Sequence, residues 1–110
     1  MPKPEATPDR VAILFGALGD RRRLALLKSL REGPRSIAEL SRGGEISRQA
    51  MTKHLRVLED AGIVRSDRFG REVRFRLERE ALTQAQDFLS TVSAQWEDAL
   101  GRLRMHIKGH

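Results

Sequence analysis

Hydrophobic residues recur at helical spacing in the first third of the chain. The spacing predicts a helix from residue 9 to Gly19, with apolar positions at Val11, Leu14, Phe15 and Leu18. Asp20 can accept backbone N–H bonds and so begin a second helix, which Gly33 and Pro34 end. The expected core stripe of this helix is Leu24, Leu27 and Leu30, with Leu26 beside it. Residues 1–8 show no apolar pattern and are expected to form a flexible arm.

The middle of the chain is typical of a helix-turn-helix. A short helix is predicted over residues 36–42, where Ser36 and Glu39 have the spacing of a capping box. Gly43 and Gly44 form the turn before the next helix. In such a motif the first helix braces the second, which enters the DNA major groove.

The helix predicted over about residues 47–61 separates apolar from polar side chains. Ser47 can cap its start, and Gly62 can adopt the left-handed conformation that ends it. Its apolar positions are Ala50, Met51, Leu55 and Leu58. The opposite face carries donors and positive charges with no acid before Glu59: Arg48, Gln49, Thr52, Lys53 and Arg56. Such groups suit the edges of DNA bases.

Residues 64–77 alternate apolar and charged side chains around Gly70. Val73, Phe75 and Leu77 alternate with arginines, which is the period of a half-buried antiparallel strand. Five arginines occur here, at positions 65, 68, 71, 74 and 76. The pattern predicts a two-stranded ribbon that reaches the DNA backbone or minor groove, with a merely solvated face as the alternative.

Residues 80–108 lack proline and are predicted to form one long helix. Its apolar positions follow a seven-residue repeat: Leu82, Ala85, Leu89, Val92, Trp96, Ala99 and Leu103. This face exceeds what one small domain needs, which favours packing against a second copy. The alternative is that Trp96 fills the core of its own subunit.

Composition narrows the partners. The chain of 110 residues fits one domain, over residues 9–110, and its net charge of +6 favours nucleic acid or an anionic membrane surface. There is no apolar run of eighteen residues and no signal-peptide pattern, so we expect a cytoplasmic protein without a membrane partner. The absence of cysteine excludes disulfides, thiolate metal sites and thiol redox switches.

Together these motifs resemble the ArsR/SmtB family of winged-helix repressors. The family's recognition helix typically reads Ser, five residues, His-Leu-x-x-Leu-x-x-Ala-Gly-Leu-Val. The matching positions are Ser47, His54, Leu55, Leu58, Ala61, Gly62, Ile63 and Val64. Residues 18–30 are similar to the family's second helix and residues 68–77 to its wing. The resemblance implies a mainly α fold with a β-hairpin wing (α+β), in which N- and C-terminal helices form a dimer.

The same resemblance implies a homodimeric transcriptional regulator, expected to repress from a palindromic operator in double-stranded DNA; activation stays open. The residues expected to bind DNA are Ser47, Arg48, Gln49, Thr52, Lys53, His54, Arg56, Arg68, Arg71 and Arg74. Among these, His54 is either a groove-side or a helix-packing residue. Arg21, Arg22 and Arg23 either contact phosphate or are solvated. The residues expected near the two-fold axis are Leu14, Leu18, Val92, Trp96 and Leu100.

The metal sites of the family have no match here. Residues 37–41 lack the Cys-x-Cys motif, and Asp87 lacks the histidine that accompanies it in sensors with a last-helix site. No metal and no cofactor are therefore expected, with zinc on His106 and His110 as the alternative. The release signal is then an organic ligand at the dimer interface, a partner protein or the amount of protein. An enzyme is disfavoured by the lack of a nucleophile with its base, whereas a helical interaction module indifferent to DNA sequence is the main rival.

Overall fold

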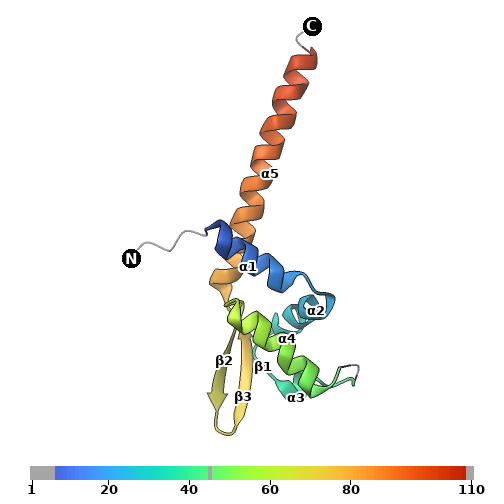
Figure 1. Ribbon diagram of the computed structural model, residues 1–110, viewed down its shortest axis with the longest axis vertical. Helices are drawn as coiled ribbons and strands as arrows, with labels where there is room; N and C mark the ends of the chain where they lie inside the picture. The colour runs from blue at the N-terminus through green and yellow to red at the C-terminus, as the bar shows by residue number, and fades with distance from the viewer. Residues whose placement is uncertain (1–6, 45, 109–110) are drawn as a thin grey trace, which may run out of the picture.

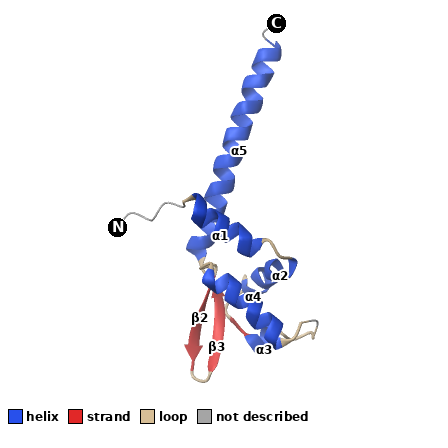
Figure 2. Ribbon diagram, in the orientation of Figure 1, coloured by secondary structure: helices blue, strands red, loops and turns tan. Residues whose placement is uncertain are grey.

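The computed structural model describes residues 7–44 and 46–108 as a winged helix-turn-helix. Its elements are α1 (Pro8–Leu18), α2 (Arg21–Leu30), β1 (Arg35–Ser36), α3 (Ile37–Leu40), α4 (Arg48–Asp60), β2 (Val64–Phe69), β3 (Glu72–Leu77) and α5 (Arg79–Lys108). Helices dominate, and the wing of β2 and β3 hangs below them (Figures 1 and 2). The mainly α fold with a β-hairpin wing is therefore confirmed. None of the helices in the described ranges is long and apolar enough to cross a membrane.

The first helix begins earlier than the sequence pattern indicates. The Thr7 hydroxyl accepts a bond from the backbone N–H of Arg10 at 3.1 Å, and Pro8 occupies the first helical turn. Proline suits that position because the N–H it lacks would have no partner inside the helix. The flexible arm expected over residues 1–8 is thus wrong for Thr7 and Pro8, and its remainder, residues 1–6, lies outside the described residues.

The core lies between α1, α2, α4 and the sheet. Its most deeply buried side chains are Leu14, Leu30, Leu55, Leu58, Ile63 and Val64. On α2 the buried residues are Leu26 and Leu30, whereas Leu24 is 50% exposed. The expected stripe was wrong at Leu24, because residues two apart, such as 24 and 26, point about 200° apart on a helix. The buried side of α2 therefore follows Leu26 and Leu30, which lie four residues apart on one face of the helix.

The sheet has the order β1-β3-β2 and is antiparallel. In the wing, the register runs from Val64 opposite Leu77 to Phe69 opposite Glu72, and Gly70 turns the chain with a φ of 65°. Strand β1 was not predicted. It contains two residues, and Ser36 at its end also caps α3 through the expected capping box with Glu39.

The last helix extends away from the body of the protein (Figure 1). Only Ala81 and Ala85 of its 30 residues are buried, and residues 86–98 are all exposed. The Phe15 and Phe88 rings, 5.8 Å apart, mark the side of α5 that meets α1. The radius of gyration is 18.7 Å, against about 13 Å for a compact chain of this length. Most of α5 is therefore uncovered by the rest of the described chain.

Candidate nucleic-acid interface

Helix α4 is fixed at both ends. Ser47 Oγ accepts a bond from the backbone N–H of Ala50 at 3.1 Å. At the other end, Gly62 has a φ of 77°, its N–H donates to Glu59 O, and the N–H of Ile63 donates to Leu58 O, both at 2.9 Å. These two bonds form a Schellman motif, which satisfies helix carbonyls that would otherwise lack partners. Both caps agree with the sequence analysis.

The outward face of α4 holds uncommitted polar groups. Its apolar side is buried at Met51, Leu55 and Leu58, so the predicted polar residues are left exposed: Ser47, Arg48, Gln49, Thr52, Lys53 and Arg56. The Thr52 hydroxyl donates to Arg48 O at 2.7 Å and can still accept a bond. The side chains of Arg48, Gln49, Lys53 and Arg56 make no hydrogen bond or ion pair with another described residue. This face is free to bind an external partner.

His54 does not belong to that face. Its side chain is 17% exposed, and its Nδ1 lies 3.4 Å from Arg23 Nη1 and 3.9 Å from Asp20 Oδ1. The groove-side placement was therefore wrong, and the helix-packing alternative holds, because His54 points to the flank of α4 that meets α2. The hydrogen bond from the backbone N–H of Arg23 is the main cause that lowers the pKa of Asp20.

The arginines at the start of α2 divide into two kinds. Arg23 Nε donates to Ala17 O at 2.5 Å, so Arg23 is committed to the internal structure. Arg21 and Arg22 are exposed, and their guanidinium groups have no hydrogen bond or ion pair within the described ranges. Only these two remain candidates for phosphate contact.

The wing carries both paired and free arginines. On its outer face, Arg65 lies 2.6 Å from Glu78 and Arg76 lies 2.8 Å from Asp67. Arg74 bonds Glu72 at 2.9 Å and stacks at 4.8 Å on the Phe69 ring. The hydrogen bond to Glu72 raises the pKa of Arg74. This partner was not foreseen when Arg74 was expected to bind DNA.

The two free arginines of the wing lie at its tip. Arg68 and Arg71 are exposed and have no hydrogen bond or ion pair with any described residue. They flank the turn at Gly70, and Arg68 stands opposite Val73 on the strand face away from the paired arginines. The uncommitted charge of the wing is therefore concentrated at these two positions.

The residues expected at a dimer interface lie in different environments. Val92 and Trp96 on α5 are 44% and 62% exposed, and Leu100 is half-buried. Leu18 packs against the core, and Leu14 is 0% exposed, so placing Leu14 at an interface was wrong: it points into its own subunit. The large apolar residues of α1 and α5 that are exposed include the predicted Val92 and Trp96. The others are Ile13, Phe88, Leu89, Leu103, Met105 and Ile107.

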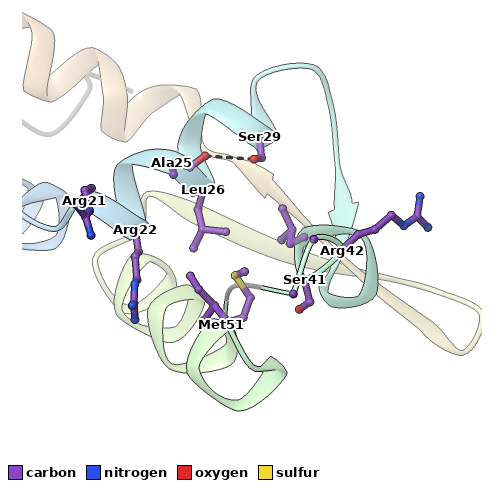
Figure 3. Close-up of a pocket in the computed structure, with 12 residues that line it drawn as sticks. Arg21, Arg22, Ala25, Leu26, Ser29, Ser41, Arg42 and Met51 are labelled. Atoms are coloured by element: carbon purple, nitrogen blue, oxygen red, sulfur yellow. Dashed lines mark hydrogen bonds between the residues drawn. The ribbon is translucent and has the colours of Figure 1, made fainter.

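A pocket of about 670 Å³ separates α2 from the helix-turn-helix. Figure 3 shows Leu26 of α2 opposite Met51 of α4, with Arg21 and Arg22 to one side and the Arg42 side chain extending away from them on the other. No acidic residue is among its described lining residues. Nearby, the buried Ser41 Oγ has no hydrogen-bond partner among the described residues. The described residues contain no group of three histidines, aspartates or glutamates that could hold a metal ion.

Comparison with known proteins gives related sequences and folds. A family described as a helix-turn-helix domain matches residues 18–67. The HTH-type transcriptional repressor SmtB of Mycobacterium tuberculosis is 34% identical over 99 residues, which are 90% of this chain and 72% of the relative. An ArsR-like transcriptional regulator from Rhodococcus sp. RHA1 superposes with a TM-score of 0.78 at 32% identity, over 88% of this chain and 92% of that one.

A third similar protein is described as an assembly. The homodimeric winged helix-turn-helix DNA-binding domain of a possible ArsR-family regulator from Mycobacterium bovis has a TM-score of 0.65 and 25% identity. The match covers 79% of this chain and 80% of that domain.

Proposed function

This chain belongs to the ArsR/SmtB family of winged helix-turn-helix transcriptional regulators, which bind DNA and are not enzymes, and we propose that it is a homodimeric repressor of a palindromic operator. The proposal rests on where the cationic side chains without an ion pair lie among the described residues. Uncommitted donors and cations gather on α4 and at the wing tip, whereas the other wing arginines are neutralised by acids. The repressor role is supported by the M. tuberculosis relative, which is a transcriptional repressor by name.

Two groups of residues divide the work of DNA binding. Arg48, Gln49 and Lys53, with the hydroxyls of Ser47 and Thr52, occupy the N-terminal half of α4 and read base edges in the major groove. Arginine and lysine favour guanine there, and glutamine favours adenine. Arg56, Arg68 and Arg71 hold phosphates or the minor groove. Arg74 is left out because Glu72 neutralises it.

The homodimer we propose pairs two α5 helices in antiparallel orientation. With the seven-residue repeat of α5, an antiparallel register places Trp96 against Ala99 of the second copy and Leu103 against its Val92. Each layer then combines a large with a smaller side chain, whereas a parallel pair would set Trp96 against Trp96. Residues 102–108 contain three arginines and lysines and no acid. Parallel helices would bring these cations together, but antiparallel ones place Lys108 opposite Asp87.

The release signal we propose is an organic anion. The pocket between α2 and α4 has apolar walls and three arginines, and its volume lies within the range of small-molecule sites. It lies away from α1 and α5, so this proposal moves the signal from the dimer interface to the base of the recognition helix. Titration with 2-naphthoate should raise the thermal midpoint and weaken operator binding, while the uncharged 2-naphthamide should do neither. Equal effects of the two compounds would exclude a charge-selective pocket.

Selection from random duplex DNA tests the main proposal. Duplexes retained by the protein in a gel shift at near-physiological salt should converge on an inverted repeat, and zinc or a chelator should not change that repeat. The half-sites should lie about one helical turn apart, since each α4 of a dimer enters one major groove. A pool without any preferred sequence would favour the rival reading, a dimerisation module with non-specific DNA binding.

A further inference from the structure

One guanidinium joins the recognition helix to both helices that carry the proposed dimer surface. Arg10 projects from α1, its Nη1 donates to Ala61 O at 2.5 Å, and its Nε donates to Gln84 Oε1 at 3.1 Å. Ala61 is the C-cap of α4, and Gln84 belongs to α5. All three groups are at least partly buried, so water competes less with these bonds than it would at fully exposed positions.

The end of α4 is shaped to receive this side chain. The Schellman bonds use the carbonyls of Leu58 and Glu59, which leaves the Ala61 carbonyl for Arg10. A Cβ at position 62 would lie 3.0 Å from Arg10 Nη2, so Gly62 provides room as well as a positive φ. The carbonyl end of a helix carries partial negative charge, which a guanidinium stabilises.

We propose that Arg10 is a positioning residue that sets the angle between α4 and the dimer helices, and so the spacing between half-sites that the dimer accepts. This inference rests on the proposed homodimer. A small tilt of α4 at Ala61 moves its far end by a larger distance. Gln49, where bases are read, lies about 18 Å along α4 from Ala61 at 1.5 Å per residue. A tilt of about 10° about the Arg10 anchor would displace Gln49 by roughly 3 Å, close to the ~3.4 Å rise of one base pair.

The distance between the two α4 helices can be measured without DNA. Because the chain has no cysteine, Gln49→Cys introduces a single site for a nitroxide label in each copy. Pulsed electron–electron double resonance then reports the distance between the two labels in the dimer. In this background, Arg10→Met removes the donors that reach Ala61 and Gln84, whereas Gln84→Leu breaks only the link to α5. Arg31→Met is the matched control, since Arg31 is exposed and has no ion pair among the described residues.

We expect a narrow distance distribution in the labelled Gln49→Cys protein, called the parent, and in the same protein with Arg31→Met. In Arg10→Met it should broaden by several ångströms, up to about twice the ~3 Å displacement of one helix, and Gln84→Leu should broaden it less. Unchanged distributions in both variants would overturn the inference. If Arg10→Met does not fold by circular dichroism, Gln84→Leu alone decides. A parent without dipolar coupling would be a monomer, which would refute the proposed homodimer instead.

A second readout uses operators with altered spacing. Inverted repeats with the central spacer changed by one base pair should bind the unsubstituted protein about tenfold more weakly, a loss comparable to that from one mismatched pair. For Arg10→Met the preference should fall to about threefold or less, while Arg31→Met should keep it. A purely structural role would weaken all spacers by one common factor, and that result would also overturn the inference.

Discussion

Replacing Trp96 by alanine should separate the stability of the dimer from that of the single chain. Trp96 is 62% exposed within one chain and lies in the part of α5 that no other element covers. Truncation therefore removes little internal packing. If a second copy covers α5, the same truncation removes a large apolar contact from each side of the interface.

The size of the effect follows from the exposed area. A tryptophan buries up to about 250 Å², so 62% exposure leaves roughly 155 Å² for a partner to cover. At about 25 cal/mol per Å², complete coverage would contribute ~4 kcal/mol per copy, and half coverage ~2 kcal/mol. Two copies at half coverage give ~4 kcal/mol, which corresponds to a dissociation constant about a thousandfold higher.

Sedimentation velocity over a range of protein concentrations measures this change. Trp96→Ala should sediment as a monomer at concentrations where the unsubstituted protein is dimeric. The helices other than α5 should keep their helix content. The neighbouring Glu97→Ala is the control, because position 97 points away from the apolar stripe. A dimer that persists in Trp96→Ala with unchanged affinity would refute the assignment of this face to the interface.

On the wing, Arg71→Ala should reduce the slope of log affinity against log salt by about 2 for a dimer, about 1 for each lost phosphate contact. Arg74→Ala should change the slope much less because Glu72 already neutralises Arg74; equal changes in a salt titration would be inconsistent with this division. In the core, Leu14→Ala should lower the free energy of unfolding by about 2–5 kcal/mol in urea denaturation, and a loss seen only in dimer affinity would contradict the burial of Leu14. At α3, the backbone N–H of Ser36 is the main group that lowers the pKa of Glu39. The stability that the ionised carboxylate contributes is present above its ordinary pKa of about 4.3 and is lost as pH falls through the lowered value. Glu39→Gln should therefore melt at a lower temperature than the unsubstituted protein at pH 7, and the difference in melting temperature should narrow as the pH falls below the ordinary pKa. A difference that stays constant as the pH falls would contradict a contribution from the ionised carboxylate.

Local signals in the sequence predicted most of the framework. The caps at Asp20, Ser47 and Gly62 were found because each depends on a residue type within one turn of a helix end. The face of a helix is a tertiary property and was harder to predict. In α2, three leucines at helical spacing formed one plausible stripe, but packing selected Leu26 and left Leu24 outside.

The candidate site was predictable in its residue types but not in its pairings. The run of arginines indicated DNA binding, yet the cross-strand contacts that commit Arg76 to Asp67 follow from the register of the wing. Arg10 contacts residues that lie 51 and 74 positions away from it in the sequence, so no local pattern reveals these contacts. Strand β1 was missed because two residues cannot show a period.

Parallel selections with the unsubstituted protein and Gln49→Ala test whether α4 reads the bases of an operator. Both proteins should be assayed at the same salt concentration from the same pool of random duplexes. Both proteins should enrich an inverted repeat with the same half-site spacing, and Gln49→Ala should lose its base preference at one position in each half-site. Identical motifs from the two proteins, or no motif from either, would contradict this role of α4.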